Sequence, residues 1–304
     1  MSLINENLFD VYEFKPPAID VLLEEKHKEY KHNNVLIQTI CPACKSKNYQ
    51  TAFNKYGFHY VQCSECMSLY VQNSLSKEEL LVYNDELDEK IYTSNTYKQY
   101  LNNLAHKNSF YLEMLFSRLF NKRVNFTIAY FGNKKYLFEK VFQNFNAVIY
   151  DIEIDDTKSN KQFDLIILDH FIEKQMGLNE IFSSVYSLLK ENAYLYVSLR
   201  TGSGIDILTL QEDSKVYPIE HQNLLSIEGI RHLMQRNSLA IKEINTPGNL
   251  DVKNILNSDS KNIPNFLKYL KKSYNLKAID EFQAFIQKNL LSSFATVIAQ
   301  KELK

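Results

Sequence analysis

All four cysteines of the chain lie between positions 41 and 66, in two Cys-x-x-Cys pairs. Cys41 and Cys44 form the first pair, and after eighteen residues Cys63 and Cys66 form the second. This spacing can place four thiolates at the corners of a tetrahedron, which is how Zn²⁺ is held in structural sites. Buried free thiols and a redox-active dithiol are the alternatives. A site with four cysteine ligands has no open coordination position, so we expect its zinc to stabilise the fold and not to activate a substrate.

A second group of chemically useful side chains occupies residues 220–223, with the sequence Glu-His-Gln-Asn. Ser226 is the expected N-cap of the helix that follows, so this group is predicted to form a loop. His221 has the pKa range of a general base, and a carboxylate such as Glu220 can fix the tautomer of an imidazole. His170, after another predicted strand, is the next candidate base. The other interpretation is that His221 only caps or packs the loop.

The composition limits the class of protein that carries these residues. The chain has 304 residues, of which 45% are hydrophobic and 23% charged, and these values exclude a disordered, collagenous or coiled-coil chain. Lys and Arg total 35 against 36 Asp and Glu, so there is no general attraction to nucleic acid, and residues 36–75 are only slightly basic. No apolar run of about 18 residues appears. We therefore expect a soluble cytoplasmic protein with no membrane or nucleic-acid partner.

The elements that must position these residues alternate along the second half of the chain. Residues 76–83 and 97–120 are predicted helices. Apolar runs predict strands at 126–131, 147–150, 165–168, 194–199, 241–244 and 294–299, separated by helices at 134–145, 178–190 and 226–236 and by a helical stretch from 264 to 291. Continuous apolar runs are typical of a parallel sheet covered on both faces, so the predicted fold is a doubly wound, mostly parallel α/β sheet. Ligands of such sheets bind beyond the carboxyl ends of the strands, here at 131–136, 151–156, 169–174 and 200–223.

Three parts follow from this pattern. Residues 36–75 form the expected Cys₄ zinc ribbon, 76–123 a helical connector, and 124–304 the sheet domain with a helical insertion near 251–291. We expect the ribbon and the sheet domain to be stabilised separately. Thr201-Gly202-Ser203-Gly204, after the strand 194–199, is either a backbone site for a phosphate or sugar, or a simple turn.

The order of these parts resembles class I S-adenosylmethionine-dependent methyltransferases that carry an N-terminal zinc ribbon. The resemblance covers about Cys41 to the C-terminus. It lies in CPAC and CSEC with Leu69-Tyr70-Val71, in FDLIILDHFIEK (163–174), in SLLKENAYLYVSL (187–199) and in PIEHQNLLSIEGI (218–230). The last segment, with TPGNLDV (246–252) and NLLSSF (289–294), is similar to sugar- and polysaccharide-linked members, which implies a small, sugar-linked acceptor.

The resemblance also implies a Rossmann-like cofactor site for S-adenosylmethionine. Gly132 is the one glycine retained from the family's glycine-rich loop, in which Ile128 replaces the usual acid and Tyr130 and Lys134 replace glycines. Asp151 follows 19 residues after Gly132, where the family binds the ribose hydroxyls, and Asp169 lies at the end of the fourth strand beside the methionine pocket. Only eleven residues separate Asp151 from Phe163, so the middle of the sheet is shortened.

Two functions follow from these observations. The first is methyl transfer from S-adenosylmethionine to a sugar-linked hydroxyl or amine, with His221 and Glu220 as base and orienter and Gly132, Asp151 and Asp169 at the cofactor. The second is a catalytically inactive or repurposed relative that binds another ligand or a protein partner.

Overall fold

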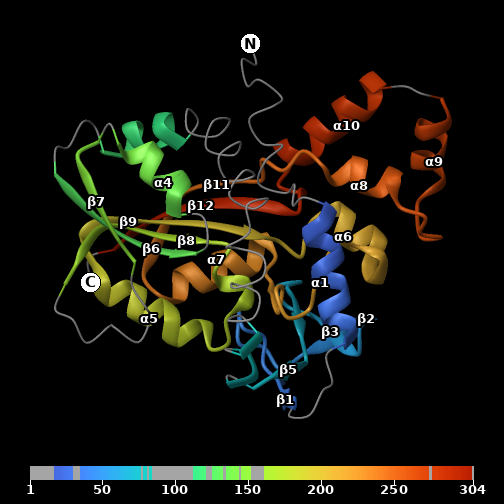
Figure 1. Ribbon diagram of the computed structural model, residues 1–304, viewed down its shortest axis with the longest axis horizontal. Helices are drawn as coiled ribbons and strands as arrows, with labels where there is room; N and C mark the ends of the chain where they lie inside the picture. The colour runs from blue at the N-terminus through green and yellow to red at the C-terminus, as the bar shows by residue number, and fades with distance from the viewer. Residues whose placement is uncertain are drawn as a thin grey trace.

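The computed structural model describes residues 17–29, 35–76, 78–80, 82–83, 112–120, 125–132, 135–143, 145–151, 161–273 and 276–302. Its largest element is a six-stranded sheet, ordered β11-β12-β9-β8-β6-β7 (Figure 1). The strands are β6 (Phe126–Gly132), β7 (Ala147–Asp151), β8 (Phe163–Asp169), β9 (Leu189–Arg200), β11 (Leu239–Asn245) and β12 (Phe294–Lys301). All six strands predicted from apolar runs are therefore confirmed. The strand β9 begins earlier than expected, because helix α5 (Leu178–Leu188) ends at Leu188 and the chain turns directly into the sheet.

The sheet is mostly parallel, as predicted. Strands β7, β6, β8 and β9 pair in parallel, while β12 runs antiparallel to both β9 and β11. From β6 the chain passes through α4 (Lys135–Phe142) to β7 on one side, and then returns to β8 on the other side of β6. The carboxyl ends of β6 and β8 thus form a topological switch point, the place where open α/β sheets bind their ligands.

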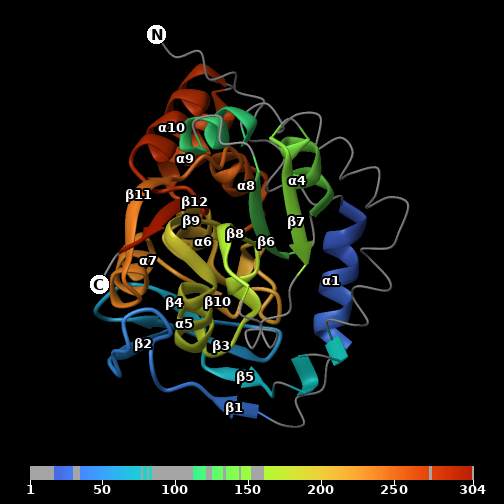
Figure 2. The same cartoon turned by 90° about the vertical axis from the view of Figure 1, so that its left-hand side faces the viewer.

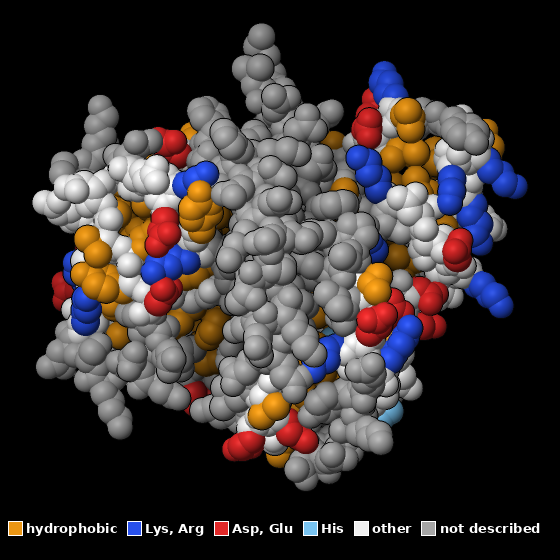
Figure 3. Space-filling view, in the orientation of Figure 1, with side chains coloured by type: hydrophobic (Ala, Val, Ile, Leu, Met, Phe, Trp, Pro, Cys, Tyr) orange, Lys and Arg blue, Asp and Glu red, His pale blue; other side chains and the backbone are white. Residues whose placement is uncertain are grey.

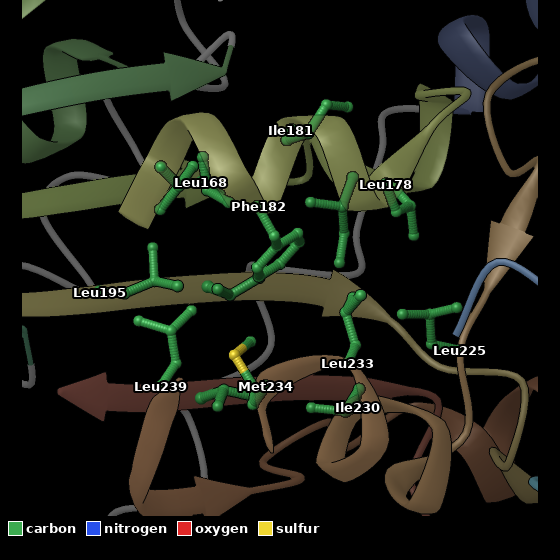
Figure 4. Close-up of a cluster of buried hydrophobic side chains, with 14 of the residues drawn as sticks. Leu168, Leu178, Ile181, Phe182, Leu195, Leu225, Ile230, Leu233, Met234 and Leu239 are labelled. Carbon is green, nitrogen blue, oxygen red and sulfur yellow. The ribbon is translucent and has the colours of Figure 1, made fainter. Parts of the chain in front are cut away.

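Helices cover both faces of this sheet (Figure 1). One face packs against α4 and the helix at 112–120, through a cluster that includes Phe116, Phe138 and Tyr196. The other face packs against α5 and α7 (Ile227–Arg236), whose apolar side chains point into one shared cluster with the sheet (Figure 4). Of the predicted connector helix 97–120, only residues 112–120 fall within the described part of the chain.

The cysteine-bearing segment forms a small antiparallel sheet in the order β10-β4-β3-β2. Strands β2 (Tyr49–Lys55), β3 (Phe58–Cys63) and β4 (Leu69–Val71) come from this segment, and a short separate pair joins β1 (Val35–Ile37) to β5 (Asn73–Leu75). The fourth strand, β10 (Asn223–Leu224), comes from the distant Glu-His-Gln-Asn loop. Helix α1 (Pro17–Glu29) lies beside this small sheet (Figure 2).

The ribbon and the sheet domain share one hydrophobic core. Cys41, Cys63, Cys66 and Tyr70 belong to the same buried cluster as the α5 and α7 side chains. The two parts therefore pack against each other, because the apolar ends of the ribbon are buried against helices of the sheet domain. That the two parts are stabilised separately stays a prediction. Their boundary in sequence does not divide the core.

The predicted helical stretch 264–291 is present as more than one helix. The structure has α9 (Asn265–Lys272) and α10 (Leu276–Lys288), preceded by α8 (Asp251–Asn257). With α6 (Ile205–Leu210) these helices surround a further apolar cluster. The surface of this lobe exposes Phe266, Tyr269 and Phe285 among lysine side chains (Figure 3). Two 3₁₀ turns, η3 (Ile172–Lys174) and η4 (Gln211–Asp213), complete the described elements. No helix in the described ranges is long and apolar enough to cross a membrane.

Candidate functional site

The four cysteines converge in the ribbon as their spacing predicts. Their Sγ atoms all lie within 4.8 Å of one another, with 3.6 Å between Cys41 and Cys66 and 3.4 Å between Cys44 and Cys63. A tetrahedron built on Zn–S bonds of about 2.3 Å has S–S edges of about 3.8 Å, so the cluster has the size of a zinc site. All four are free thiols in the structure. The donor set and its dimensions fit a closed four-sulfur metal centre.

Hydrogen bonds between the thiols and burial shift the pKa values of the cysteines in this cluster. The hydrogen bond from the Cys41 thiol lowers the pKa of Cys66 to about 5 and raises the pKa of Cys41 above its usual range. Burial raises the pKa of Cys44 to about 11. Metal ligation requires all the thiols to lose their protons, so metal affinity at this site should fall as the pH falls. Arg236 of α7 donates to the carbonyl oxygen of Ala43 at 2.5 Å and holds the first knuckle against the sheet domain.

At the switch point, a row of residues crosses the carboxyl ends of three strands. Gly132 of β6 is the register partner of Asp169 in β8, and Asp169 is the partner of Ser198 in β9. The buried Asp169 carboxylate accepts hydrogen bonds from the Ser198 hydroxyl at 2.5 Å and from the Tyr130 hydroxyl at 3.3 Å. A Cβ atom on Gly132 would stand 2.5 Å from the carbonyl oxygen of Asp169, and the φ angle of Gly132 is +148°. Glycine is therefore required here by the close approach of two strands.

Asp151 ends β7, next to β6 on the far side of the switch point. Its side chain is 66% exposed, and its carboxylate forms an ion pair with Lys135 at 2.5 Å. The hydrogen bond to Asp151 raises the pKa of Lys135. The carboxylate of Asp151 is thus accessible at the carboxyl end of β7, and it has a neighbouring cation, at the first residue of α4, that the sequence reasoning did not include.

His170 and Glu173 form an imidazole–carboxylate pair directly after β8. Nδ1 of His170 lies 2.9 Å from Oε1 of Glu173, and the same oxygen accepts a hydrogen bond from the backbone N–H of Arg200 at 2.8 Å. The His170 ring stacks on Phe294, with 5.5 Å between ring centroids, and its φ angle is +49°. Glu173 is 1% exposed, whereas the His170 side chain is 26% exposed. A fixed ring with a buried carboxylate on Nδ1 is the arrangement that a general base needs.

In the structure, Glu220 and His221 make different contacts from those that the sequence predicted. Glu220 forms a buried ion pair with Lys174 of η3, with 2.6 Å between Nζ and Oε2. The backbone N–H of Tyr217 donates to Nδ1 of His221 at 3.0 Å, so the backbone, and not Glu220, faces this nitrogen. The hydroxyl of Tyr60 in the ribbon donates to the His221 carbonyl oxygen at 2.8 Å. The loop is thus held within its surroundings by both backbone and side-chain contacts.

The 201–204 segment is a packed turn. Its amides donate within the protein, from Thr201 to the carbonyl of Ser293, from Gly202 to Leu225 and from Gly204 to Thr201. Side chains at Gly202 and Gly204 would collide with neighbouring backbone. Three of its four amides thus donate within the protein, which favours the turn over the phosphate or sugar site.

Several contacts at the strand ends were not predicted from the sequence. Glu173, Lys174, Ser198 and Tyr130 all contact predicted site residues. The signal for Glu173 was its spacing, because residues three apart in a turn after a strand face each other. Lys174 gave no such signal, since its partner Glu220 is far away in sequence.

A scan with models of known families finds no match, and a search of curated proteins finds none either. Among solved structures, the chain is similar to a methyltransferase from Archaeoglobus fulgidus that depends on S-adenosylmethionine, with 15% identity, coverage of 72% of this chain and 100% of that one, and a TM-score of 0.41. A Haemonchus contortus N-methyltransferase in complex with phosphomonomethylethanolamine and S-adenosylhomocysteine shares 13% identity over 95% of this chain and 75% of that one, with a TM-score of 0.46.

A third similar structure is the cyclopropane synthase MmaA2 from Mycobacterium tuberculosis, with 10% identity, coverage of 64% of this chain and 85% of that one, and a TM-score of 0.39. At these identities and TM-scores, the likenesses carry no weight for activity. The α/β assignment follows from the strand order and pairing of the chain itself.

Proposed function

We propose that this protein transfers a methyl group from S-adenosylmethionine to a small acceptor. The observation that carries the proposal is the switch point between β6 and β8, with Gly132 at its centre and the exposed carboxylate of Asp151 at the end of the neighbouring strand. An adenosine that lies across this edge can place its ribose hydroxyls on Asp151. When bound, S-adenosylmethionine supplies an electrophilic methyl carbon on its sulfonium.

The donors at this edge fit the cofactor only in part. Asp151 is accessible for a vicinal diol, and Gly132 presents backbone at the switch point. The Asp169 carboxylate is already engaged by Ser198 and Tyr130, so its role is to fix these two side chains beside the cofactor and not to bind the ligand directly. We therefore expect weaker cofactor binding than in a protein with a complete glycine-rich loop.

His170 fits the role of general base better than His221. Glu173 holds Nδ1 of His170, so Nε2, which is buried in the structure, is the nitrogen that would take the proton from an acceptor hydroxyl once an acceptor reaches it. In His221, by contrast, Nδ1 lies 3.0 Å from the backbone nitrogen and 3.2 Å from the carbonyl oxygen of Tyr217, so the backbone of its own loop, and not a carboxylate, faces this nitrogen. We assign His221 and Glu220 a structural role, in which their loop shapes the acceptor side of the site. The sugar-linked acceptor remains part of the proposal through the resemblance of residues 218–230.

A second candidate function is supported by Tyr130. Tyr130 occupies a position where the family's loop has a glycine. Its hydroxyl would lie 2.9 Å from a Cβ on Gly132. This hydroxyl, together with the buried Ile128 in place of an acid, is what a repurposed relative without methyl transfer would show.

Titration calorimetry of the full chain with S-adenosylhomocysteine and S-adenosylmethionine separates the two functions. The proposal predicts saturable binding of both, whereas no heat up to millimolar ligand favours the repurposed relative. Methyl transfer to a panel of sugar-linked hydroxyls and amines then tests the base. We expect His170→Asn to reduce turnover by about 10² to 10⁴ with unchanged affinity for S-adenosylhomocysteine.

A further inference from the structure

We propose that metal binding at the four cysteines sets the position of the loop 217–224, so that the ribbon controls the acceptor side of the site. The assignment of this loop to the acceptor side rests on the proposed function. The coupling itself rests only on contacts between the ribbon and the loop.

The ribbon holds the loop through backbone and side-chain hydrogen bonds from three of its strands. The hydroxyl of Tyr60 in β3 donates to the carbonyl oxygen of His221 at 2.8 Å. The N–H of Val71 in β4 donates to the carbonyl oxygen of Gln222 at 2.9 Å, and the Ser74 hydroxyl of β5 bonds the Gln222 side chain. The loop then continues as β10, a strand of the ribbon's own sheet. Loop and ribbon therefore form one hydrogen-bonded unit.

Two of the metal ligands, Cys63 and Cys66, lie at the junction of β3 and β4, two of the strands that make these contacts. Cys63 is the last residue of β3, and its N–H donates to the carbonyl oxygen of Ser68 at 2.9 Å, which closes the second knuckle just before β4. The Ser68 hydroxyl accepts from the Cys66 thiol at 3.2 Å and from the N–H of Ser226 at 3.0 Å. Any movement of this knuckle is therefore passed to β3, to β4 and to the start of α7.

The Ser226 cap ties the same knuckle to helix α7. Its hydroxyl accepts from the N–H of Gly229 at 2.8 Å and donates to the carbonyl oxygen of Cys66. One side chain thus caps the helix after the loop and closes the turn that carries a metal ligand. A Cβ on Gly229 would collide with the Ser68 hydroxyl and stand 3.0 Å from the Ala43 side chain, so the helix start fits closely against both knuckles.

On its other side the loop contacts the short turn η3 and helix α1, which lie outside the ribbon. Glu220 pairs with Lys174, and the Asn223 side chain donates to the carbonyl oxygen of Ile172 at 3.1 Å, both on the short turn η3. Helix α1 adds a bond from the N–H of Ile219 to Nε2 of His27 at 3.1 Å. Because structural zinc contributes folding free energy directly, removal of the metal should loosen the knuckles and, with them, the loop.

Hydrogen exchange measured by mass spectrometry tests this coupling on the full chain, without cofactor or acceptor. We expect peptides that cover 217–226 to lose protection by tenfold or more when zinc is removed with a chelator, in parallel with peptides of 58–71, while β8 and β12 keep their protection. Unchanged exchange at 217–226 in the metal-free protein would overturn the proposal. Since no ligand is used, this outcome is independent of whether methyl transfer occurs.

A conservative pair of variants decides the question if the metal-free chain unfolds as a whole. Tyr60→Phe removes the hydroxyl that reaches His221, whereas Tyr49→Phe removes a ribbon hydroxyl that accepts from Gln72, within the ribbon. Both should retain one zinc per chain. We expect faster exchange at 217–226 in Tyr60→Phe only, and equal exchange in the two variants would overturn the proposal.

Discussion

Replacement of Lys174 by methionine should destabilise the protein much more than the loss of an ordinary surface lysine. The Lys174 and Glu220 side chains are 17% and 3% exposed, and their charged atoms are 2.6 Å apart. Methionine keeps the length of the chain but leaves the Glu220 carboxylate buried without this cation. Loss of one partner of a buried ion pair typically costs about 3 to 5 kcal/mol.

This loss of unfolding free energy corresponds to a fall in the melting temperature. An unfolding entropy of about 2.1 cal/mol/K per residue gives about 0.64 kcal/mol/K for this chain, so Tm should fall by roughly 5 to 8 °C. Differential scanning calorimetry of the zinc-loaded protein at pH 7 measures the shift. The double variant Lys174→Met/Glu220→Gln should recover much of the loss, because it removes the charge that lost its partner.

Lys190→Met is the matched control. Lys190 pairs with Asp164 at 2.6 Å, but these side chains are 42% and 19% exposed, and backbone and hydroxyl donors of Thr127 also bind Asp164. Such a pair contributes less than about 1 kcal/mol, so we expect Tm to fall by less than about 2 °C. Equal shifts for Lys174→Met and Lys190→Met, or no recovery in the double variant, would refute the reasoning from burial.

Three further results are expected. Gly132→Ala should destabilise the fold by about 1 to 3 kcal/mol in urea unfolding, because the new Cβ meets the Asp169 carbonyl at 2.5 Å; an unchanged midpoint would mean that the strands can separate there. Asp151→Asn should weaken S-adenosylhomocysteine binding about 10- to 100-fold in calorimetry. An unchanged Kd would mean that the ribose binds elsewhere. Burial and the charge of Arg200 lower the pKa of Lys55 to about 8, so the unfolded chain holds this proton more tightly. Stability should therefore rise between pH 8 and pH 10, and urea midpoints of Lys55→Met should rise less over the same range.

The parts of this protein that the sequence predicted well are those encoded by local patterns. The spacing of the cysteines predicted that their four sulfur atoms lie close together, as they do in the structure. Apolar runs located every strand of the main sheet, because buried parallel strands show little alternation. Ser226 caps α7 as expected, since an N-cap depends on a hydroxyl and the backbone three residues on.

The features that the sequence reasoning missed depend on contacts between distant segments. β10 has two residues, too few to show any periodicity, yet it joins the ribbon to the loop. Glu220 was expected to orient its neighbour His221, but the path of the loop turns its carboxylate toward Lys174. The shared core of ribbon and sheet domain was missed for a similar reason, because an apolar residue in a sequence does not show which element will cover it.

The location of the cofactor is tested most directly by a crystal structure of the zinc-loaded protein with S-adenosylhomocysteine. The proposed function predicts electron density across the carboxyl ends of β6, β7 and β8. In that density the ribose hydroxyls contact Asp151, and the sulfur lies on the His170 side of Gly132. Density for the ligand at another site, or an empty switch point in crystals soaked at millimolar concentration, would contradict the proposal.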